Sequence, residues 1–355
     1  MDKTTLNKGP VTFAAIDPWL QQNIVLPTET KGAKFVQWGT NNRYPDYLLD
    51  LYRNVPTLRS IISGSADFVA GDDVVSRVPL NGEAPAREVV HDTAVQDFIF
   101  GGFAFQVIRD REGRPVRAIP TPVNYLRTDE DNEIFYYSEK WNKGGRDALV
   151  YPKFMPNLDW SRMDEAARAR HANSILYVKG ERLQAYPAPL YCAAVKACEL
   201  ERGITDYHVN ALENAFTGSL VINFNNGVPT DEVKEEIERA FTEKFSGSQN
   251  GGRIAFSWNP NRESATTFQS VKVEDFGARY DALSKWARQQ IFTAFQAVPA
   301  LFGLMTETTG FSEQEFQQAF RLYNKTRVLP VQRRITDALE LIFGAGVVTI
   351  TPFSL

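Results

Sequence analysis

Apolar residues recur at helical spacing once the chain has passed a polar, proline-containing start. Residues 1–40 mix Pro, Asn, Gly and Thr with isolated apolar positions, a composition typical of an extended arm. From Tyr44 onward the apolar positions lie three or four residues apart, which predicts amphipathic helix up to Gly71. Those positions are Tyr47, Leu48, Leu51, Leu58, Ile61, Ile62 and Phe68. Pro56 and Gly64 argue against one unbroken helix over this stretch.

Strand patterns follow a second helix. The run from 89 to 99 predicts a helix that stops at Gly101-Gly102, and beyond it apolar and small or polar residues alternate over 103–107 in the manner of a strand. Residues 111–114 predict a hairpin turn. Further strands are predicted at 116–119, 125–127, 134–137 and 175–178. The stretch 139–172 is rich in turn and polar residues, and we interpret it as a surface excursion.

The second half of the chain alternates long helices with a short strand-helix-strand segment. One stripe of apolar and alanine positions runs from Pro189 to Phe216, and a second runs from about Glu274 to Gln296. Between them the pattern predicts a strand at 219–224, a helix at 231–245 that begins with two acidic residues, and a strand at 253–258.

A last helix is predicted from Ser312 to about Phe343. Ser312 and Glu315 have the spacing of a capping box, and Phe311 with Phe316 can form its hydrophobic staple. Pro330 lacks a backbone N–H, so we expect a kink in the interior of this helix.

Composition narrows the class of protein. The 355 residues, 43% apolar and 23% charged, have the balance of an ordinary folded protein with two or three subdomains. Cys192 and Cys198 lie on different faces of a predicted helix, and the three histidines are scattered. We therefore expect no disulfide framework, no metal site and no cofactor.

Charge and hydropathy argue against a membrane-spanning protein, a secreted protein and a tight binder of nucleic acid. The chain has no apolar run of about 18 residues and no basic segment followed by an apolar one at Met1, so we expect neither a membrane span nor a secretory signal. The net charge of -4 argues against a surface that binds nucleic-acid phosphates tightly.

The motifs of enzymes are weak in this sequence. Gly101-Gly102 lacks the spacing and the Lys-Ser/Thr pair of a phosphate-binding loop, and no serine lies in a Gly-x-Ser-x-Gly elbow. Carboxylates cluster at 72–73, 129–131 and 232–236, which we interpret as solvated turns and helix faces, because charge is least costly at the surface. The sequence therefore nominates no catalytic residue.

A basic group on the last helix is the strongest candidate for contact with DNA. Its members are Arg321, Lys325, Arg327, Arg333 and Arg334. At about 100° per residue they do not share one face, since Arg321 and Lys325 lie on one side and Arg327 and Arg334 on another. We favour salt bridges between subunits over DNA contacts for this group.

The order of these elements resembles the portal protein family of tailed phages and prophages. The resemblance covers residues 45 to 343 and rests on four local motifs. The first is Ile99-Phe100-Gly101-Gly102-Phe103-Ala104-Phe105, followed by a turn at Gly113 and by Pro120-Thr121-Pro122, and the second is the run 216–224, followed by an acidic helix and Asn250-Gly251-Gly252-Arg253. The third is the run 291–295, which leads to Val298-Pro299-Ala300-Leu301-Phe302-Gly303. The fourth is Leu329-Pro330 in the last helix.

The resemblance implies an α+β portal fold without a large crown. It has a mixed α/β wing, antiparallel long stem helices, a small strand-helix-strand clip and a kinked helix after a tunnel loop. The implied boundaries are an N-terminal arm at 1–40, the wing at 41–186, a stem helix at 187–216, the clip at 217–272, a stem helix at 273–298, the tunnel loop at 299–311, and the kinked helix with a C-terminal strand returning to the wing at 312–355.

The resemblance also implies a function and partners. The chain would be one subunit of a ring, twelve copies in all, that forms a DNA channel at one capsid vertex, and it would not be an enzyme. The ring would contact the major capsid protein, the terminase large subunit, a head-tail adaptor and, without sequence specificity, double-stranded DNA. It would reside in the virion, and in the host cytoplasm during assembly.

The resemblance further assigns two groups of site residues. The clip would present Asp231, Glu232, Glu235, Glu236 and Arg239 to the motor and adaptor. The tunnel loop would place Met305, Thr306, Glu307, Thr308 and Thr309 in the channel.

Two alternatives stay open at this point. A metal-dependent nucleic-acid-processing enzyme would need the carboxylate clusters to hold a divalent ion. Another ring-forming head-tail or baseplate protein would normally lack the helix-clip-helix insertion at 217–272.

Overall fold

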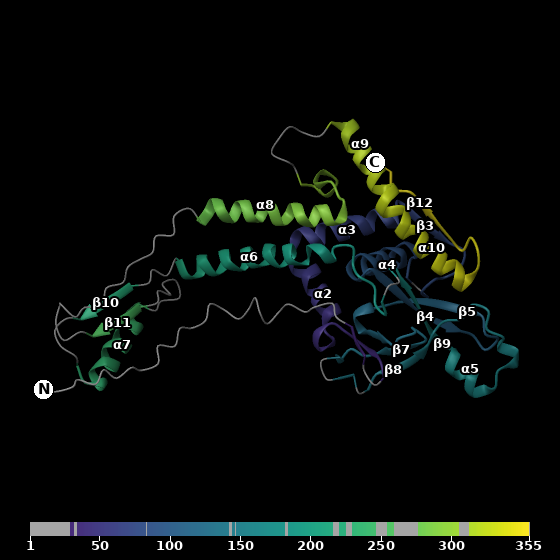
Figure 1. Ribbon diagram of the computed structural model, residues 1–355, viewed down its shortest axis with the longest axis horizontal. Helices are drawn as coiled ribbons and strands as arrows, with labels where there is room; N and C mark the ends of the chain where they lie inside the picture. Colours follow the sequence, from purple (N-terminus) through teal and green to yellow (C-terminus); the bar gives the residue numbers. More distant parts are fainter. Residues whose placement is uncertain are drawn as a thin grey trace. The chain divides into compact units, whose positions relative to one another are not determined.

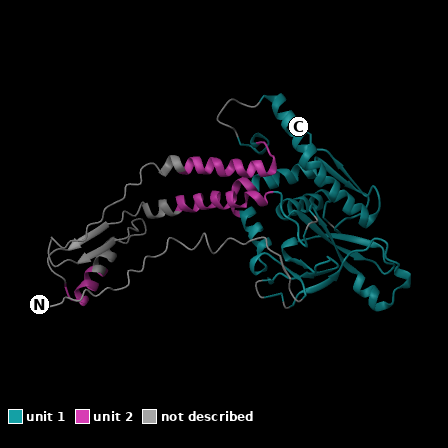
Figure 2. Cartoon of the chain, in the orientation of Figure 1, with its two compact units in different colours: residues 1–53, 59–190, 299–355 teal, residues 54–58, 191–298 magenta. Residues whose placement is uncertain are grey.

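The computed structural model describes eleven stretches of the chain, which form two compact units (Figures 1 and 2). The described residues are 29–31, 34–82, 84–141, 144–145, 147–181, 184–215, 220–224, 229–245, 254–258, 276–304 and 312–354. Unit 1 comprises Met1–Arg53, Arg59–Leu190 and Pro299–Leu355, and unit 2 comprises Asn54–Leu58 and Tyr191–Val298. Helices and strands occur together, which confirms the predicted α+β class. The assignment of segments to a wing, stem and clip stays a prediction.

The first two long helices are separated at a single residue. They are α2 (Tyr44–Asn54) and α3 (Pro56–Ala70). The break expected at Pro56 is confirmed, because the proline ring disfavours helical backbone in the residue before it. Gly64 does not interrupt α3. An added Cβ there would lie 3.0 Å from Phe302 Cδ1, so the glycine allows that ring to approach the helix closely.

Unit 1 contains a three-stranded antiparallel sheet in the order β5-β4-β9. The strands are β4 (Gly102–Arg109), β5 (Pro115–Thr121) and β9 (Asn173–Lys179), and the helix α4 (Ala86–Phe100) leads directly into β4. α4 ends at Gly101, whose φ of 79° is left-handed. An added Cβ at Gly101 would lie 2.2 Å from the Ala188 carbonyl oxygen, so this turn requires glycine. The helix, strands and hairpin turn predicted for this region are confirmed.

A second antiparallel sheet has the order β6-β7-β8. It consists of β6 (Leu126–Thr128), β7 (Ile134–Tyr137) and β8 (Leu149–Pro152), and the helix α5 (Glu165–His171) follows along the chain. The stretch 139–172, interpreted from sequence as a surface excursion, contains β8 and α5, which the sequence pattern did not predict. β8 is an edge strand with Leu149 and Val150 both exposed, so its sequence lacks an apolar-polar alternation, and α5 buries no residue and has no apolar stripe.

Two short strand pairs complete the sheets of unit 1. β1 (Glu29–Lys31) pairs with β2 (Val36–Trp38), and β3 (Asp73–Ser76) pairs with β12 (Val348–Thr351), both antiparallel. Within the segment predicted as an arm, residues 29–31 and 36–38 form these two strands, and Val36 and Trp38 of β2 are buried; the arm itself stays a prediction. Residues 1–28 lie outside the described residues. The strand expected at the C-terminal end of the chain is β12.

A buried arginine stabilises the contact between β6 and the segment that follows β2. Arg127 has 0% exposure, donates from Nε to Asn42 Oδ1 at 2.5 Å, and donates from its terminal nitrogens to the carbonyls of Asn42, Asn124 and Leu126. Its guanidinium also lies 4.8 Å from the centre of the Trp141 ring. Burial lowers the pKa of Arg127 to about 10, so the side chain stays charged at neutral pH.

The last helical segment of unit 1 consists of three parts. α9 (Glu313–Tyr323) continues through a π-helical turn at Asn324–Val328 into α10 (Leu329–Phe343). The predicted capping box is present, since Ser312 Oγ accepts from Glu315 N and the Glu315 carboxylate accepts from Ser312 N. Phe311 lies outside the described residues. The irregularity expected from Pro330 takes the form of the π turn, because Pro330 cannot donate to the carbonyl four residues earlier.

Unit 2 contains two long helices that run antiparallel, α6 (Val195–Ala215) and α8 (Phe276–Phe295) (Figure 1). Small buried residues, including Ala197 and Ala287, allow close approach of the two helices, as the alanine-rich stripe predicts. The rings of Tyr207 and Tyr280 stack across the pair, with their centroids 4.7 Å apart. Both long helices predicted for this region are confirmed.

The same unit contains a strand-helix-strand segment, as predicted. It consists of β10 (Leu220–Phe224), α7 (Asp231–Phe245) and β11 (Ile254–Trp258). β10 and β11 pair in parallel, from Leu220 opposite Ile254 to Phe224 opposite Trp258.

Short 3-10 helices occur in both units. They lie at Thr40–Asn42, Val123–Tyr125, Trp160–Arg162, Cys192–Ala194 and Pro299–Phe302.

Candidate functional site

The five charged residues predicted for the clip lie on one face of α7. At about 100° per residue, Asp231, Glu232, Glu235, Glu236 and Arg239 fall within an arc of about 140°. All five side chains are exposed. Four carboxylates and one guanidinium make this face acidic. The Lys234 ammonium donates to Asp231 Oδ1 at 2.6 Å and lowers the pKa of Asp231.

The residues predicted for the channel loop lie outside the described residues. Met305, Thr306, Glu307, Thr308 and Thr309 all belong to the gap between 304 and 312. Their place in the molecule stays a prediction.

The structure separates the five basic residues of the last helical segment into three environments. Arg321, Lys325 and Arg333 are exposed, Arg327 is half-buried on the π turn, and Arg334 lines a groove described below. The role predicted for them, salt bridges between subunits or contacts with DNA, stays a prediction.

Arg334 forms an ion pair within its own chain. Its guanidinium donates to Asp97 Oδ2, which joins α10 to α4. Asp97 is only 4% exposed, and burial raises the pKa of its carboxyl while Arg334 partly opposes that rise. Among the described residues, Asp97 Oδ1 and Arg334 Nε have no hydrogen-bond partner. Sequence analysis missed Asp97, although a lone carboxylate within the apolar run before Gly101 was a usable signal.

A hydroxyl chain connects α9 to α3 beside the π turn. Ser65 Oγ donates to the Ile61 carbonyl at 2.6 Å, so the Tyr323 hydroxyl donates to Ser65 Oγ, also at 2.6 Å. Burial raises the pKa of Tyr323 to about 12, and the positive charge of Arg327 opposes that rise. Arg327 Nε is buried and has no hydrogen-bond partner among the described residues.

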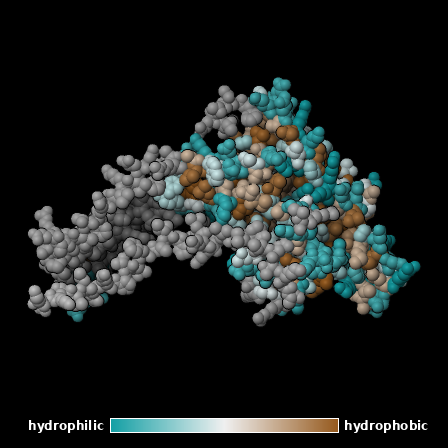
Figure 3. Space-filling view, viewed as in Figure 1, coloured by the Kyte–Doolittle hydropathy of each residue, from teal (hydrophilic) through white to brown (hydrophobic). Residues whose placement is uncertain are grey.

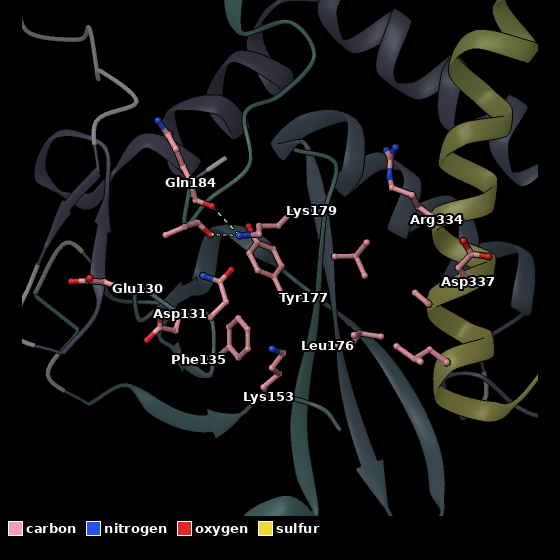
Figure 4. A pocket seen from close by; sticks show the side chains of 15 residues that line it. Glu130, Asp131, Phe135, Lys153, Leu176, Tyr177, Lys179, Gln184, Arg334 and Asp337 are labelled. Carbon is pink, nitrogen blue, oxygen red and sulfur yellow. Dashed lines mark hydrogen bonds between the residues drawn. The ribbon is translucent and has the colours of Figure 1, made fainter. Parts of the chain in front are cut away.

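A groove of about 680 Å³ lies between the β6–β7 turn and α10 in unit 1 (Figure 4). β9 lies at its base, Asp131 borders one side, and Asp337 of α10 borders the other. Leu341 of α10 also lines the groove. Leu341 is 48% exposed.

The three cations of the groove are engaged within the chain. Lys153 Nζ pairs with Glu133 at 2.6 Å, Lys179 Nζ donates to the carbonyls of Gln184 and Ala185, and Arg334 pairs with Asp97. Asp131 and Asp337 form no ion pair with any described residue. The groove therefore presents negative charge and an exposed leucine.

The α6–α8 pair combines a buried carboxyl with apolar surface. Glu201 Oε1 accepts from Thr57 Oγ1 at 2.7 Å, and burial raises the pKa of Glu201 while its hydrogen bonds from Thr57 and the charge of Arg288 oppose the rise. Hydrophobic residues lie on the surface along α8 (Figure 3). They include Leu283 and Trp286, the latter 50% exposed.

Nothing in the described stretches gathers ligands for a metal ion. No group of three or more His, Cys, Asp or Glu side chains there is arranged to hold one. Cys198 is buried, and burial raises the pKa of its thiol, which disfavours the reactive thiolate. None of the helices in the described part of the chain has the length and apolar character that a bilayer crossing requires.

Comparison with known sequences gives one family and two relatives. The model of the family described as phage portal protein matches residues 79–348. An uncharacterized protein of Rickettsia felis is 22% identical over 283 residues, which are 77% of this chain and 67% of the relative. An uncharacterized protein of Rickettsia bellii is 26% identical over 128 residues, which are 36% of this chain and 31% of the relative.

Comparison with solved structures shows the same fold in chains of a gene transfer agent particle. A chain from the virion of a native gene transfer agent particle has a TM-score of 0.52 and 17% identity, with 86% of this chain and 83% of that chain covered. A chain from the neck of the native particle, computed with C12 symmetry, has a TM-score of 0.51 with the same identity and coverage.

Proposed function

Because the chain belongs to the phage portal protein family, whose model matches residues 79–348, we propose that copies of it form a closed ring through which double-stranded DNA enters and leaves a capsid. The protein is a portal, that is, a subunit of the head-to-tail connector. The observation that carries this conclusion is the extent of the family match, which includes most of unit 1 and the whole α6–α8 pair with its insertion.

The ring is proposed to contain twelve copies. The neck of the gene transfer agent particle, whose chain has the same fold, was computed with C12 symmetry, which supports that number. A closed ring needs two different surfaces on each subunit that fit each other, because its contacts are head-to-tail.

The acidic face of α7 is proposed to meet the terminase large subunit during packaging and a head-tail adaptor afterwards. Its support is the clustering of four exposed carboxylates, among them Glu235 and Glu236, on one side of a helix. Surface charge that is mainly of one sign steers a partner of the opposite sign and favours replaceable contacts. We expect basic surfaces on both partners.

The channel is proposed to be lined in part by the loop Met305–Thr309. DNA must slide through a portal, so its wall should not hold phosphates tightly, and the net charge of -4 supports weak, sequence-independent contact. The remaining partner is the major capsid protein around the ring.

The protein is proposed to act as structure and not as an enzyme. Phage portal proteins are a structural family, and none of the described carboxylates is arranged to hold a metal, which an enzyme of the kind considered above would need. Its place is the portal vertex of the virion, with the host cytoplasm as the site of assembly.

Native mass spectrometry with negative-stain class averages tests the ring. We expect a closed assembly of about twelve subunits with a central hole of roughly 20 Å or more, the width of duplex DNA. A monomer or dimer that persists at high protein concentration would contradict the proposal, and metal-dependent cleavage of DNA by that species would favour the enzyme.

A charge-reversal variant tests the α7 face. Glu235→Lys with Glu236→Lys should leave ring mass unchanged and reduce binding of the purified terminase large subunit of the same phage by roughly tenfold. The control is Glu165→Lys with Asp159→Lys, which changes net charge equally on unit 1. Equal binding by both variants would show that the motor docks elsewhere.

A further inference from the structure

Two surfaces of unit 1 have complementary charge and apolar character, and neither has a partner within the described chain. The first, which we call the α9 knob, consists of Arg321, Leu322 and Lys325. The second, which we call the α10 groove, is the groove of about 680 Å³ bordered by Asp131, Asp337 and Leu341.

The α9 knob is an exposed leucine between two cations. Leu322 is 65% exposed, and Arg321 and Lys325 are exposed on the same side of the helix, since positions one and four residues apart lie within about 100° of each other. Neither cation forms an ion pair with any described residue. Between Glu315 and Asp337 the chain carries five basic residues and no acidic one, so this stretch has no local counter-charge.

The α10 groove offers the opposite charge beside apolar surface. The cations that line the groove form ion pairs or hydrogen bonds within the chain, so Asp131 and Asp337 are the charges available to a docking partner. Leu341 provides exposed apolar area next to Asp337, one helical turn away. A leucine with flanking cations therefore complements this groove in both charge and apolar character.

We propose that the α9 knob of one copy docks into the α10 groove of the next copy around the ring. This inference rests on the proposed ring, and it assigns the two non-identical surfaces that a head-to-tail contact requires. Arg321 and Lys325 would pair with Asp131 and Asp337, while Leu322 would pack beside Leu341. Burial of the two leucines favours association through the hydrophobic effect, and the charges fix the orientation.

The apolar residue distinguishes this contact from one with DNA. A phosphate backbone would neutralise Arg321 and Lys325 but would leave Leu322 in water, and it would repel the α10 groove. A second copy satisfies all of these groups at once.

Three variants test the proposal in the full-length protein. The knob variant is Arg321→Glu with Lys325→Glu, the groove variant is Asp131→Lys with Asp337→Lys, and the exchange variant carries all four changes. Each altered side chain is exposed, so folding should be preserved, and circular-dichroism melting checks this. Arg111→Glu with Arg170→Glu is the control for the knob variant, because it makes the same change in net charge at exposed positions of unit 1 away from both surfaces.

Native mass spectrometry at fixed protein concentration gives the readout. Wild type, the control and the exchange variant should form rings, whereas the knob and groove variants should each need a protein concentration roughly tenfold higher or more. Mixing the knob and groove variants should restore rings in which the two alternate, because the native knob of the groove variant meets the native groove of the knob variant and the acidic knob meets the basic groove.

Each other outcome overturns the inference. Rings from both variants at the wild-type concentration would show that these surfaces do not meet, while the ring itself would stand. Loss of rings in the knob variant alone, or unchanged rings with weaker DNA retention, would assign the knob to a different partner. Absence of rings from wild type would instead refute the proposed function.

Discussion

The carboxylate of Asp97 on α4 accepts a hydrogen bond from the guanidinium of Arg334 on α10, and these two residues lie 237 positions apart in the chain. Asp97→Asn keeps the shape of the side chain and removes its charge. We expect the free energy of unfolding to fall by about 2 kcal/mol, less than for a fully buried pair because Arg334 is 32% exposed. Urea denaturation followed by circular dichroism measures this change.

Two further variants make the Asp97 result interpretable. Asp92→Asn changes an exposed carboxylate on the same helix and should alter the free energy by less than about 0.5 kcal/mol. Asp97→Leu combined with Arg334→Met should be more stable than Asp97→Leu alone, because the second change removes the unpaired guanidinium. The opposite order would mean that Arg334 does not depend on Asp97.

Arg127 should tolerate no replacement, not even by lysine. An ammonium cannot donate at once to Asn42 and to the carbonyls of Asn124 and Leu126 in the way that the planar guanidinium does. Arg127→Lys should lower the free energy of unfolding by about 3 kcal/mol. The exposed Arg117→Lys on β5 is the control, and thermal melts of the two that coincide would refute the prediction.

Glu201 should make stability depend on pH. Burial raises the pKa of this carboxyl in the folded state above its unfolded value, which is about 4.3. The protonated carboxyl is therefore favoured by folding, and its contribution is full below the unfolded pKa and is lost as pH rises through the folded pKa.

The Glu201→Gln variant isolates this titration. The difference in melting temperature between wild type and Glu201→Gln should shift against wild type as pH rises from about 4 through the raised pKa. Glu199→Gln, two residues away on the same helix, is the control for the loss of one negative charge from the helix. A difference between wild type and Glu201→Gln that stays constant with pH would show that Glu201 titrates normally.

Gly101 should be far less replaceable than Gly303, although their φ angles are nearly equal. Both are left-handed, at 79° and 78°, so alanine costs about 1 kcal/mol at either position for the backbone alone. An added Cβ at Gly101 would also lie 2.2 Å from the Ala188 carbonyl oxygen, whereas the one at Gly303 meets no atom of the described residues within 4 Å. Gly101→Ala should therefore lower the free energy of unfolding by about 3 kcal/mol or more. Equal losses would mean that the chain around Ala188 moves freely.

Local patterns predicted the regular elements well where a side-chain period was present. The long helices α6 and α8 carry apolar stripes, Pro56 marks the break between α2 and α3, and Ser312 with Glu315 marks the start of α9. β8 and α5 were missed for the complementary reason. An exposed edge strand and a helix with no buried residue impose no period on their sequence.

The candidate surfaces were harder to predict because they depend on contacts between distant segments. The α7 face could be found from sequence, since its charges lie on one helix. The α10 groove could not, because Asp131 lies in the β6–β7 turn and Asp337 in α10, more than two hundred residues apart in the sequence. Arg334 shows the same limit. Arg334 was correctly predicted to lie on the last helix, but its ion pair with Asp97 could not be predicted, because it depends on the packing of α4 against α10.

The division of unit 1 into separate stretches of sequence has a consequence for synthesis. Strand β3 can pair only after β12 has been synthesised, and the hydrogen bond from Ser354 to Asp72 joins residues 282 positions apart. Contacts of such long range are slow to form, because the loop between them must close first. While the ribosome is still making unit 2, the nascent chain has neither α10 nor the last strand, and β3 has no partner in this pair. The β3–β12 pair and the hydrogen bonds between Ser354 and Asp72 therefore form only after residues 348–354 have been synthesised.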